Sequence, residues 1–551
     1  MATHPPVPPR APNPVPDRRA RAVLDDAHIG DIIGALGTIG QHQTGGRDLR
    51  SRALALAAIM GPGLIVMVGD NDAGGVSTYA QAGQNYGTSL LWVLLLLIPV
   101  LIVNQEMVVR LGAVTGVGHA RLINERFGRF WGWFSVGDLF LLNFLTIVTE
   151  FIGVSLSLGY FGVSQYIAVP AAALGLIAIT SSGSFRLWER FMLVFVIANF
   201  LVVPLAIITH PNVGNIAQHF VVPSIHGGAN STSILLIIAI VGTTVAPWQL
   251  FFQQSNIIDK RITPRWINYE RADTVIGAGV VILGAGAMIA VAAFGLAHSS
   301  AFGQFANAGA TASALKQHVS SLAGTLFAIV LLNASLIGAG ALTLSTAYAF
   351  GDVFGASQSL HRSFREAKTF YSIFAAVILA AAAIVLIPGA PLGVITTSVQ
   401  ALAGVLLPSA TVFLLLLCND RDVLGPWVNK TWLNVLASMI VGVLIVLSLI
   451  LTATTVFPHV DVAALTAALS GALVVGLLGF GVSAALSRRR GEVVPEPIYT
   501  VPREQWTMPP LAFLGRPAWS TSRKATMLFM RIYLVVAVAL LIVKAAQLGG
   551  A

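Results

Sequence analysis

Apolar segments of about 20 residues recur along most of this chain, and they restrict its fold more than any other feature. Segments such as "LLWVLLLLIPVLIV" and "VVILGAGAMIAVAAFGLA" are, with their flanks, long enough to cross ~30 Å of hydrocarbon at about 1.5 Å per residue. Only 10% of the 551 residues are charged, whereas a soluble protein has roughly 25%. The chain is therefore predicted to be an all-α integral membrane protein.

We expect twelve or thirteen transmembrane helices, the thirteenth being an appendage to a twelve-helix body. The expected ranges are 53–83, 87–113, 131–161, 166–181, 190–209, 233–258, 273–298, 321–352, 368–388, 393–418, 432–456, 461–485 and 525–547. This gives a transport core over 51–420, two accessory helices over 430–485, a polar Pro-rich linker over 486–524 and a last helix over 525–547.

Basic residues recur in alternate loops, which predicts the orientation of the chain. They stand at Arg121/Arg126/Arg129, Arg186/Arg190, Lys260/Arg261/Arg265/Arg271, Arg362/Arg365/Lys368, Arg488–Arg490 and Arg523/Lys524. The loops between them carry almost no Lys or Arg, which is the positive-inside pattern. The net charge of +9 therefore indicates a multi-pass protein of the cell inner (plasma) membrane with a cytoplasmic N-terminus, and not a nucleic-acid-binding protein.

The ends of the chain have a different composition. Residues 1–50 are rich in Pro and Arg and lack the apolar core of a signal peptide, so we expect a disordered cytoplasmic tail. The linker 486–524 is expected to be cytoplasmic too. A single cysteine, Cys418, excludes an intrachain disulfide framework and any multi-cysteine metal site.

Two of the expected helices are interrupted by polar or helix-breaking residues. The first contains "VGDNDAGGV" at 68–76, and the sixth contains "GTTVAPWQ" at 242–249. Unwound backbone at membrane depth is tolerated only where it lines a protein-enclosed or watery cavity. The first and sixth helices open the two halves of a five-plus-five arrangement, and interruptions at corresponding positions of inverted repeats indicate the substrate site of a secondary transporter.

A carboxylate in mid-membrane is costly, at about 2.5–3.5 kcal/mol on insertion scales, and a bound cation would offset that cost. Asp72 lies about midway along its span and is our main candidate ligand. Asp70 and Asn71 are further candidates near the site. The alternative is that Asp70 and Asp72 only cap the two half-helices.

Amide and carbonyl oxygens would complete the site. Gln249 and Gln253 follow the second interruption, Gln400 is the strongly polar residue deep in the tenth helix, and carbonyls near Gly69 and Thr244 would be freed by the breaks. Each glutamine could equally serve helix packing. An oxygen-only set suits hard cations, and Mg²⁺ most readily keeps several waters.

These stretches resemble the Nramp divalent-metal transporters. "GPGLIVMVGDNDAGGVSTYAQAGQNYG" is similar to their first-helix signature and "VGTTVAPWQLFFQQS" to their sixth, while "RLGAVTG", Glu150 with the residues after it, and "LPSATVFLLLLCNDRDVLG" also match. The resemblance covers roughly 50–425. It implies the leucine-transporter type of five-plus-five inverted repeat with additional C-terminal helices, and it makes Asp72 and Gln400 metal ligands and Glu150 a retained proton-pathway acid.

Several positions depart from that family pattern. Ala73 replaces the proline and Gly75 the metal-binding asparagine of the first helix. Ala246 replaces the methionine that selects transition metals, and Ile147 replaces a proton-pathway aspartate. Trp248 and Gln253 stand in place of two histidines. The set is similar to the Nramp-related magnesium transporters, a branch that carries Mg²⁺ and Mn²⁺ without proton coupling; aluminium-transporting relatives also lack the methionine.

We therefore expect a secondary transporter that imports hydrated Mg²⁺, and also Mn²⁺, by alternating access without proton coupling. The ion is substrate and no cofactor is expected; the partners are the divalent ion and the lipid bilayer. One alternative is a proton-coupled Mn²⁺/Fe²⁺ importer that uses Glu150, and another is a transporter of amino acids or other organic solutes on the same architecture. An enzyme is not expected, because no nucleophile–base pairing or His-Glu-x-x-His motif is visible.

Overall fold

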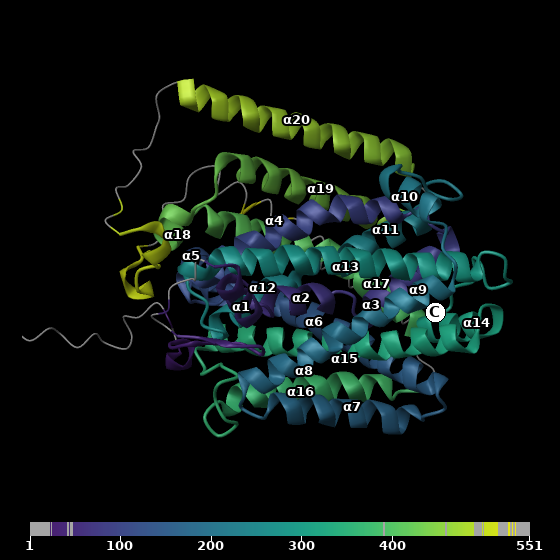
Figure 1. Cartoon of the computed structure of the whole chain (residues 1–551). Coiled ribbons are helices and arrows are strands. Elements are labelled where there is room, and N and C mark those ends of the chain that lie inside the picture. Colours follow the sequence, from purple (N-terminus) through teal and green to yellow (C-terminus); the bar gives the residue numbers. More distant parts are fainter. Residues whose placement is uncertain are drawn as a thin grey trace, which may run out of the picture.

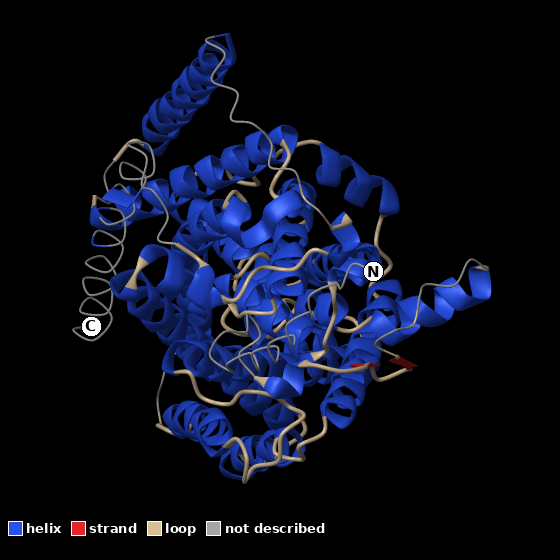
Figure 2. Ribbon diagram, turned by 90° about the vertical axis from the view of Figure 1, so that its left-hand side faces the viewer, coloured by secondary structure: helices blue, strands red, loops and turns tan. Residues whose placement is uncertain are grey.

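The protein is a bundle of helices that run side by side along one direction, as Figure 1 shows from the side and Figure 2 end-on. This computed structural model describes residues 23, 25–40, 43, 48–388, 392–457, 460–489, 499, 501–515 and the single positions 527, 528, 532 and 535. Within these residues ten helices are long and apolar enough to cross a membrane, or eleven if the bent pair at the start of the bundle is one span.

The long helices follow the apolar segments of the sequence. They are α4 (Leu91–Thr115), α6 (Arg129–Tyr160), α7 (Gln165–Thr180), α8 (Phe185–Ala198), α9 (Val202–Ile208), α11 (Ser231–Thr244), α12 (Pro247–Asp259), α13 (Ile267–Leu296), α15 (Ser321–Phe354), α16 (Lys368–Val385), α17 (Leu392–Cys418), α19 (Thr431–Val456) and α20 (Val462–Arg489). The all-helical prediction is confirmed. The expected linker lies partly, and the expected last helix mostly, outside the described residues.

The first expected helix, 53–83, is three segments. They are α1 (Leu49–Ile59), α2 (Pro62–Gly69) and α3 (Ala73–Tyr86). The break at 70–72 was expected, but the 52° bend between α1 and α2 was not. It follows from Gly61, whose φ of 151° is open to glycine and strained for other residues, and from Pro62, which starts α2 without needing a donor.

Short elements join the long ones. The helices are α5 (His119–Phe127), α10 (Val213–Val221), α14 (Ala308–His318) and α18 (Arg421–Leu424); the 3₁₀ turns are η2 (Asp26–His28), η3 (Asn199–Leu201), η4 (Pro264–Trp266), η5 (Gly425–Trp427), η6 (Arg503–Gln505) and η7 (Leu511–Phe513). Strands β1 (Ile32–Ile33) and β2 (Thr38–Ile39) pair antiparallel, with Ile32 opposite Ile39.

Burial separates an inner group of helices from an outer one. Gln400 on α17 and Gln249 on α12 are buried, and α6 packs along α15 while α13 packs along α2 and α3. In contrast, outer helices expose large apolar side chains, among them Ile207, Trp432 and Val475. These side chains face outward as lipid contacts would, whereas the polar side chains of the apolar helices are kept inside the bundle.

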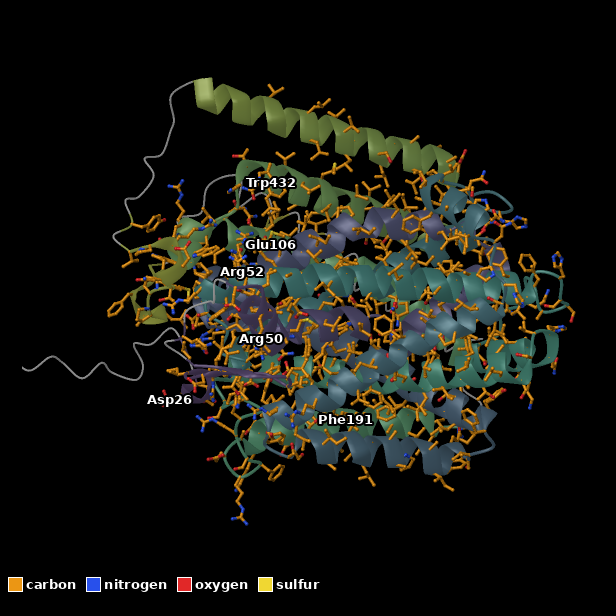
Figure 3. The ribbon with its side chains drawn as sticks, viewed as in Figure 1. Asp26, Arg50, Arg52, Glu106, Phe191 and Trp432 are labelled. Atoms are coloured by element: carbon orange, nitrogen blue, oxygen red, sulfur yellow. The ribbon has the colours of Figure 1, made fainter. Side chains whose placement is uncertain are left out.

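One end of the bundle, here called the basic end, carries the loops that hold Arg121, Arg126, Arg186, Lys260 and Arg362. It lies on the left in Figure 1, and Figure 3 labels Asp26, Arg50, Arg52 and Glu106 there. The described part of the C-terminal linker also lies at this end, because the Met508 N–H donates to the Val114 carbonyl (3.0 Å) and the Arg503 guanidinium stacks 3.9 Å from the Trp427 ring.

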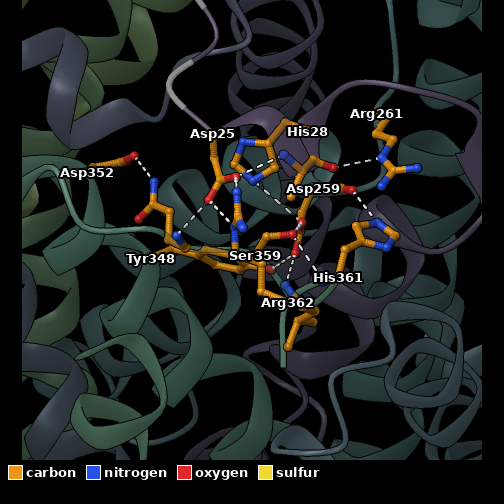
Figure 4. A network of polar contacts seen from close by, with 12 residues as sticks. Asp25, His28, Asp259, Arg261, Tyr348, Asp352, Ser359, His361 and Arg362 are labelled. Carbon is orange, nitrogen blue, oxygen red and sulfur yellow. Dashed lines mark hydrogen bonds and ion pairs between the residues drawn. The ribbon is translucent and has the colours of Figure 1, made fainter. Parts of the chain in front are cut away.

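Part of the expected disordered tail is instead folded onto the basic end. Arg362 donates to both Asp25 oxygens (2.9 Å), and Arg186 donates to Thr38 (2.5 Å). Asp259, at the end of α12, accepts from Tyr348 (2.5 Å) and the Leu360 N–H (2.8 Å) within the same network (Figure 4). For residues 25–40 the prediction of disorder was wrong. It was based on the local amino-acid composition, which carries no information about hydrogen-bond partners such as Arg186 and Arg362 that lie far along the chain.

Candidate functional site

The first break separates α2 from α3 in the middle of the bundle. Asp70 follows the last residue of α2 in helical conformation, whereas Asp72 is extended and is the N-cap of α3. Its carboxylate accepts the Gly75 N–H at 2.6 Å, as an N-cap side chain does. Asp72 therefore has the structural role that the sequence left open, but this contact occupies only one of its two oxygens.

The second break separates α11 from α12. Thr244 ends α11, Val245 and Ala246 are unwound, and Pro247 begins α12, where its missing N–H costs nothing. The Tyr79 hydroxyl of α3 lies 2.7 Å from Thr244 Oγ1, which itself donates to the Ile240 carbonyl. A hydrogen bond thus joins α3, two helical turns past the first break, to the residue that ends α11 at the second break.

Glycines allow the segments around the breaks to approach closely. A Cβ on Gly75 would lie 2.7 Å from the Asp70 carbonyl and 3.2 Å from Thr243 Oγ1. A Cβ on Gly69 would lie 3.2 Å from the Trp248 ring, and one on Gly74 would overlap the Gln400 amide. Gln400 of α17 therefore lies against the first turn of α3, as its assignment to the site requires.

Asp72 and Glu150 form an acidic pair across the contact of α3 with α6. Their side chains are neighbours, and the Ala73 N–H donates to Glu150 Oε2 at 3.0 Å. Glu150 Oε1 has no hydrogen-bond partner among the described residues. Two neighbouring carboxylates repel each other when both are ionised. The pair therefore favours a proton or a cation between or beside the two side chains.

Asp70 and Gln249 lie on the other side of the break. Both Asp70 oxygens are buried and lack a hydrogen-bond partner among the described residues, although the Gln249 side chain is close by. Gln249 accepts from the Gln105 amide at 2.8 Å and donates to the Thr244 carbonyl at 3.2 Å. Gln105 of α4 thus orients the Gln249 side chain at the break.

Two expected site residues point elsewhere. The Asn71 amide donates to the Val281 carbonyl on α13 (3.2 Å), and Gln253 donates to Thr274 on α13 (3.0 Å), one helical turn from Gln249. Ala246 and Trp248 flank the second break, and both are buried. Asp72, Gly69, Thr244, Gln249 and Gln400 are gathered around the two breaks, while Asn71 and Gln253 face the α13 side.

The sequence analysis missed Gln105, Thr243 and Tyr79. Each had a visible signal, because Gln105 follows Asn104 within the apolar second helix, and Thr243 and Tyr79 stand within the two quoted stretches. Tyr79 lies seven residues after Asp72, two turns along the same face of α3.

The site is closed to solvent. Asp72 is 2% exposed, Gln400 1%, and Glu150 and Gln249 0%. A small cavity adjoins the break, and its lining includes Asn71, Tyr79 and Asn199. Within the described residues no group of three or more His, Cys, Asp or Glu side chains is arranged to hold a metal ion. An ion at Asp72 would depend on amides, carbonyls and its own water.

Comparison with known proteins gives a family match over most of the bundle. Residues 63–454 match the family model described as "Natural resistance-associated macrophage protein-like" (Nramp). The chain is 27% identical over 403 residues to a protein of Burkholderia ambifaria named "Divalent metal cation transporter MntH", which covers 70% of this chain and 87% of that one.

Two solved structures share the fold. A manganese transporter of Eremococcus coleocola superposes with a TM-score of 0.60 at 20% identity, covering 82% of this chain and 98% of that chain. MhsT, solved in complex with L-phenylalanine, gives a TM-score of 0.50 at 15% identity, covering 75% of this chain and 99% of that one. At these identities the likeness concerns the fold, and it agrees with the expected leucine-transporter type of architecture.

Proposed function

This chain belongs to the Nramp family, and we propose that it is a secondary transporter that imports a hydrated hard divalent cation, Mg²⁺ and also Mn²⁺, without proton coupling. The observation that carries the proposal is the Asp72 carboxylate, buried at the break between α2 and α3 with an oxygen left over after capping. A buried carboxylate in a membrane protein is costly unless it is neutralised, and a passing cation does this.

The donor set favours a hard ion. Gln249, Gln400 and the carbonyls of the two breaks offer oxygen, and Ala246 offers no sulfur where the family has its methionine. Mg²⁺ and Mn²⁺ accept oxygen ligands, and Mg²⁺ keeps several waters because it dehydrates reluctantly. The ion would move with part of its hydration shell, with Asp72 as the central ligand.

The membrane potential is a sufficient driving force for uptake. A divalent cation gains about 4.6 kcal/mol on entering a cell that is ~100 mV negative inside, at about 2.3 kcal/mol per charge. At about 1.4 kcal/mol for each tenfold, this sustains more than a thousand-fold accumulation. Trp248, Gln253 and Ile147 replace groups that could relay protons, so uncoupled transport fits both the energetics and the residues present.

The basic end would face the cytoplasm of the inner (plasma) membrane. The distribution of Lys and Arg over alternate loops supports this orientation, and the folded segment 25–40 and the described part of the linker lie at the same end. Import then runs from the end that carries α10 and α14, through the two breaks, to the basic end.

The test is uptake of Mg²⁺ and Mn²⁺ into proteoliposomes. Asp72→Asn should abolish uptake while the protein stays monodisperse. The matched control is Asp138→Asn, which alters an aspartate of α6 that accepts from Ser409 at 3.2 Å, far along the helix from Glu150; it should retain uptake. Undiminished flux in Asp72→Asn would disprove the assignment.

A second candidate function is favoured by one observation, the contact of Glu150 with Asp72. This acid could release a proton when a cation arrives, which would give a proton-coupled Mn²⁺/Fe²⁺ importer. A pH-sensitive dye inside the vesicles separates the two functions, because acidification that tracks metal uptake supports coupling and its absence supports uncoupled transport.

A further inference from the structure

A buried polar face runs along α12 from the break toward the basic end. Gln249, Gln253, Asn256 and Lys260 follow one another at spacings of four, three and four residues, which places them on one side of the helix. All four are 0% exposed. Asn256 has no hydrogen-bond partner at either side-chain atom within the described residues, so this face holds more polar groups than its present contacts use.

Lys260, at the far end of this face, is fully occupied. Its ammonium donates to Glu189 at 2.6 Å and to the carbonyls of Ile59 and Met60 at 2.7 and 2.8 Å. These three contacts use its three donors. Lys260 therefore neutralises Glu189 and fixes the end of α1, and it has no hydrogen left for another acid.

Two more acids lie beside this ion pair, on the first turns of α13. Asp273 Oδ2 accepts the N–H groups of Gly61 (3.1 Å) and Gly63 (2.7 Å) at the α1–α2 bend. Glu270 is a close electrostatic neighbour of Asp273. The adjacent Arg271 pairs instead with Glu106, at 2.5 Å. Three buried acids thus share one lysine.

The atoms left without partners converge on this place. Both Glu270 oxygens, Asp273 Oδ1 and Gln253 Oε1 are buried and have no hydrogen-bond partner among the described residues. The Gln253 amide lies over this part of α13, because its nitrogen donates to Thr274 at 3.0 Å and its side chain neighbours Glu270. Two carboxylates and an amide oxygen are the donors that a hard divalent cation takes.

We propose that Glu270, Asp273 and Gln253 form a second site for a hydrated divalent cation, which the ion occupies after Asp72 on its way to the basic end. This inference rests on the proposed function and adds a second ion-binding site to the transport path. Along α13, Asp273 lies eight residues from Val281, the contact of Asn71, or about 12 Å at 1.5 Å per residue. The two sites are therefore separate, and the polar face of α12 connects them.

The test counts Mn²⁺ ions bound to the purified full-length chain, with the electron paramagnetic resonance signal of free aqueous Mn²⁺ as the readout. The wild-type protein should bind two ions. Asp72→Asn should leave one, Glu270→Gln should leave one, and the two changes combined should leave none. Glu270→Gln is chosen because neither Glu270 carboxylate oxygen has a hydrogen-bond partner of good geometry among the described residues, and because a glutamine keeps the size of the side chain beside Gln253. Asp273→Asn is the second variant.

A matched control is Glu125→Gln, which neutralises an acid of the basic end that pairs with Arg121 and should leave both ions bound. A count of one ion in the wild-type protein would overturn the second site, and it is the count expected if Glu270 and Asp273 are neutralised by protons and not by a cation. A count of two ions in both Glu270→Gln and Asp273→Asn would overturn it as well. Failure of the proposed function looks different, since transport would then survive Asp72→Asn whatever the count at Glu270.

Discussion

The N–H of Ala73 donates a 3.0 Å hydrogen bond to Oε2 of Glu150, which ties the first turn of α3 to the middle of α6. Because Glu150 also neighbours Asp72, one side chain both holds the break in place and sets the charge beside the main candidate ligand. The two roles can be separated by substitution.

Glu150→Gln keeps an oxygen for the Ala73 N–H and removes the charge. We expect the variant to fold and to bind Mn²⁺ about tenfold more weakly, a loss of about 1.4 kcal/mol. Glu150→Ala removes the acceptor as well, leaves the Ala73 N–H unpaired and should also lower the melting temperature. Calorimetric titration and thermal unfolding measure the two effects. Equal melting temperatures for both variants would contradict the positioning role.

In the resemblance to the Nramp signature, Ala246 stands at the second break where the family has a methionine, and we expect it to set the preference of the site between hard and soft metal ions. Ala246→Met adds a thioether, a ligand that soft and borderline metals accept and Mg²⁺ does not. We expect inhibition of Mn²⁺ uptake by Cd²⁺ to strengthen and inhibition by Mg²⁺ to weaken. Ala246→Leu is the matched control for size without sulfur, and it should not strengthen inhibition by Cd²⁺. If both variants respond alike, volume and not sulfur sets the selectivity.

In the resemblance to the Nramp signature, Gly75 stands where the family has a metal-binding asparagine, and the packing around it leaves no space for a larger residue. An added Cβ would lie 2.7 Å from the Asp70 carbonyl, and overpacking of this kind costs typically 1–3 kcal/mol. Gly75→Ala should therefore lower the melting temperature, and Gly75→Asn should not improve Mn²⁺ binding. Gly137→Ala, on α6 with open space around its Cβ position, is the control. A stable Gly75→Asn with tighter binding would disprove the packing argument.

Most of the fold was accessible from the sequence because lipid imposes a simple rule. A segment that crosses hydrocarbon must form its backbone hydrogen bonds within its own helix, and its sequence is a long apolar run. The predicted bounds of α4, α6 and α15 therefore lie within a few residues of the observed ones. The break at Asp72 was visible for the converse reason, since two carboxylates, an amide and a glycine pair within nine residues are costly inside a continuous transmembrane helix. The bend at Gly61 was not predicted, because a Gly-Pro pair is compatible with the start of a helix, the end of a helix or a bend between two helices.

The site was predicted less completely than the fold. Asp72 and Gln400 were identified as polar residues in apolar surroundings, but the contact of Gln105 with Gln249 joins helices that are 144 residues apart. Distances along the sequence do not disclose which helix faces meet, and the same holds for the group of Glu270, Asp273 and Gln253. The order in residues 25–40 likewise depends on Arg186 and Arg362, which lie far along the chain.

The last prediction concerns the contact of Asp25 with Arg362, which fastens the N-terminal segment to the basic end (Figure 4). Burial alone would raise the pKa of Asp25, but the hydrogen bonds from Arg362 and the Ala27 N–H, with the charges of His28 and Arg362, bring it below the ordinary 3.8. The same contact raises the pKa of Arg362. A depressed carboxylate pKa stabilises the folded state above the ordinary value, and this contribution is lost as the pH falls through the lowered one.

We therefore expect amide hydrogen exchange in residues 25–40 to stay slow, after correction for the intrinsic pH dependence, from neutral pH down to about pH 4, and to become faster only in stronger acid. Asp25→Asn keeps the size of the side chain but lacks the charge, so exchange should already be fast at neutral pH. Glu504→Gln, an exposed acid at the same end, should behave as the wild-type protein does. Slow exchange in Asp25→Asn at neutral pH would mean that the hairpin of β1 and β2, held by Arg186 and Arg190, fastens this segment without the ion pair.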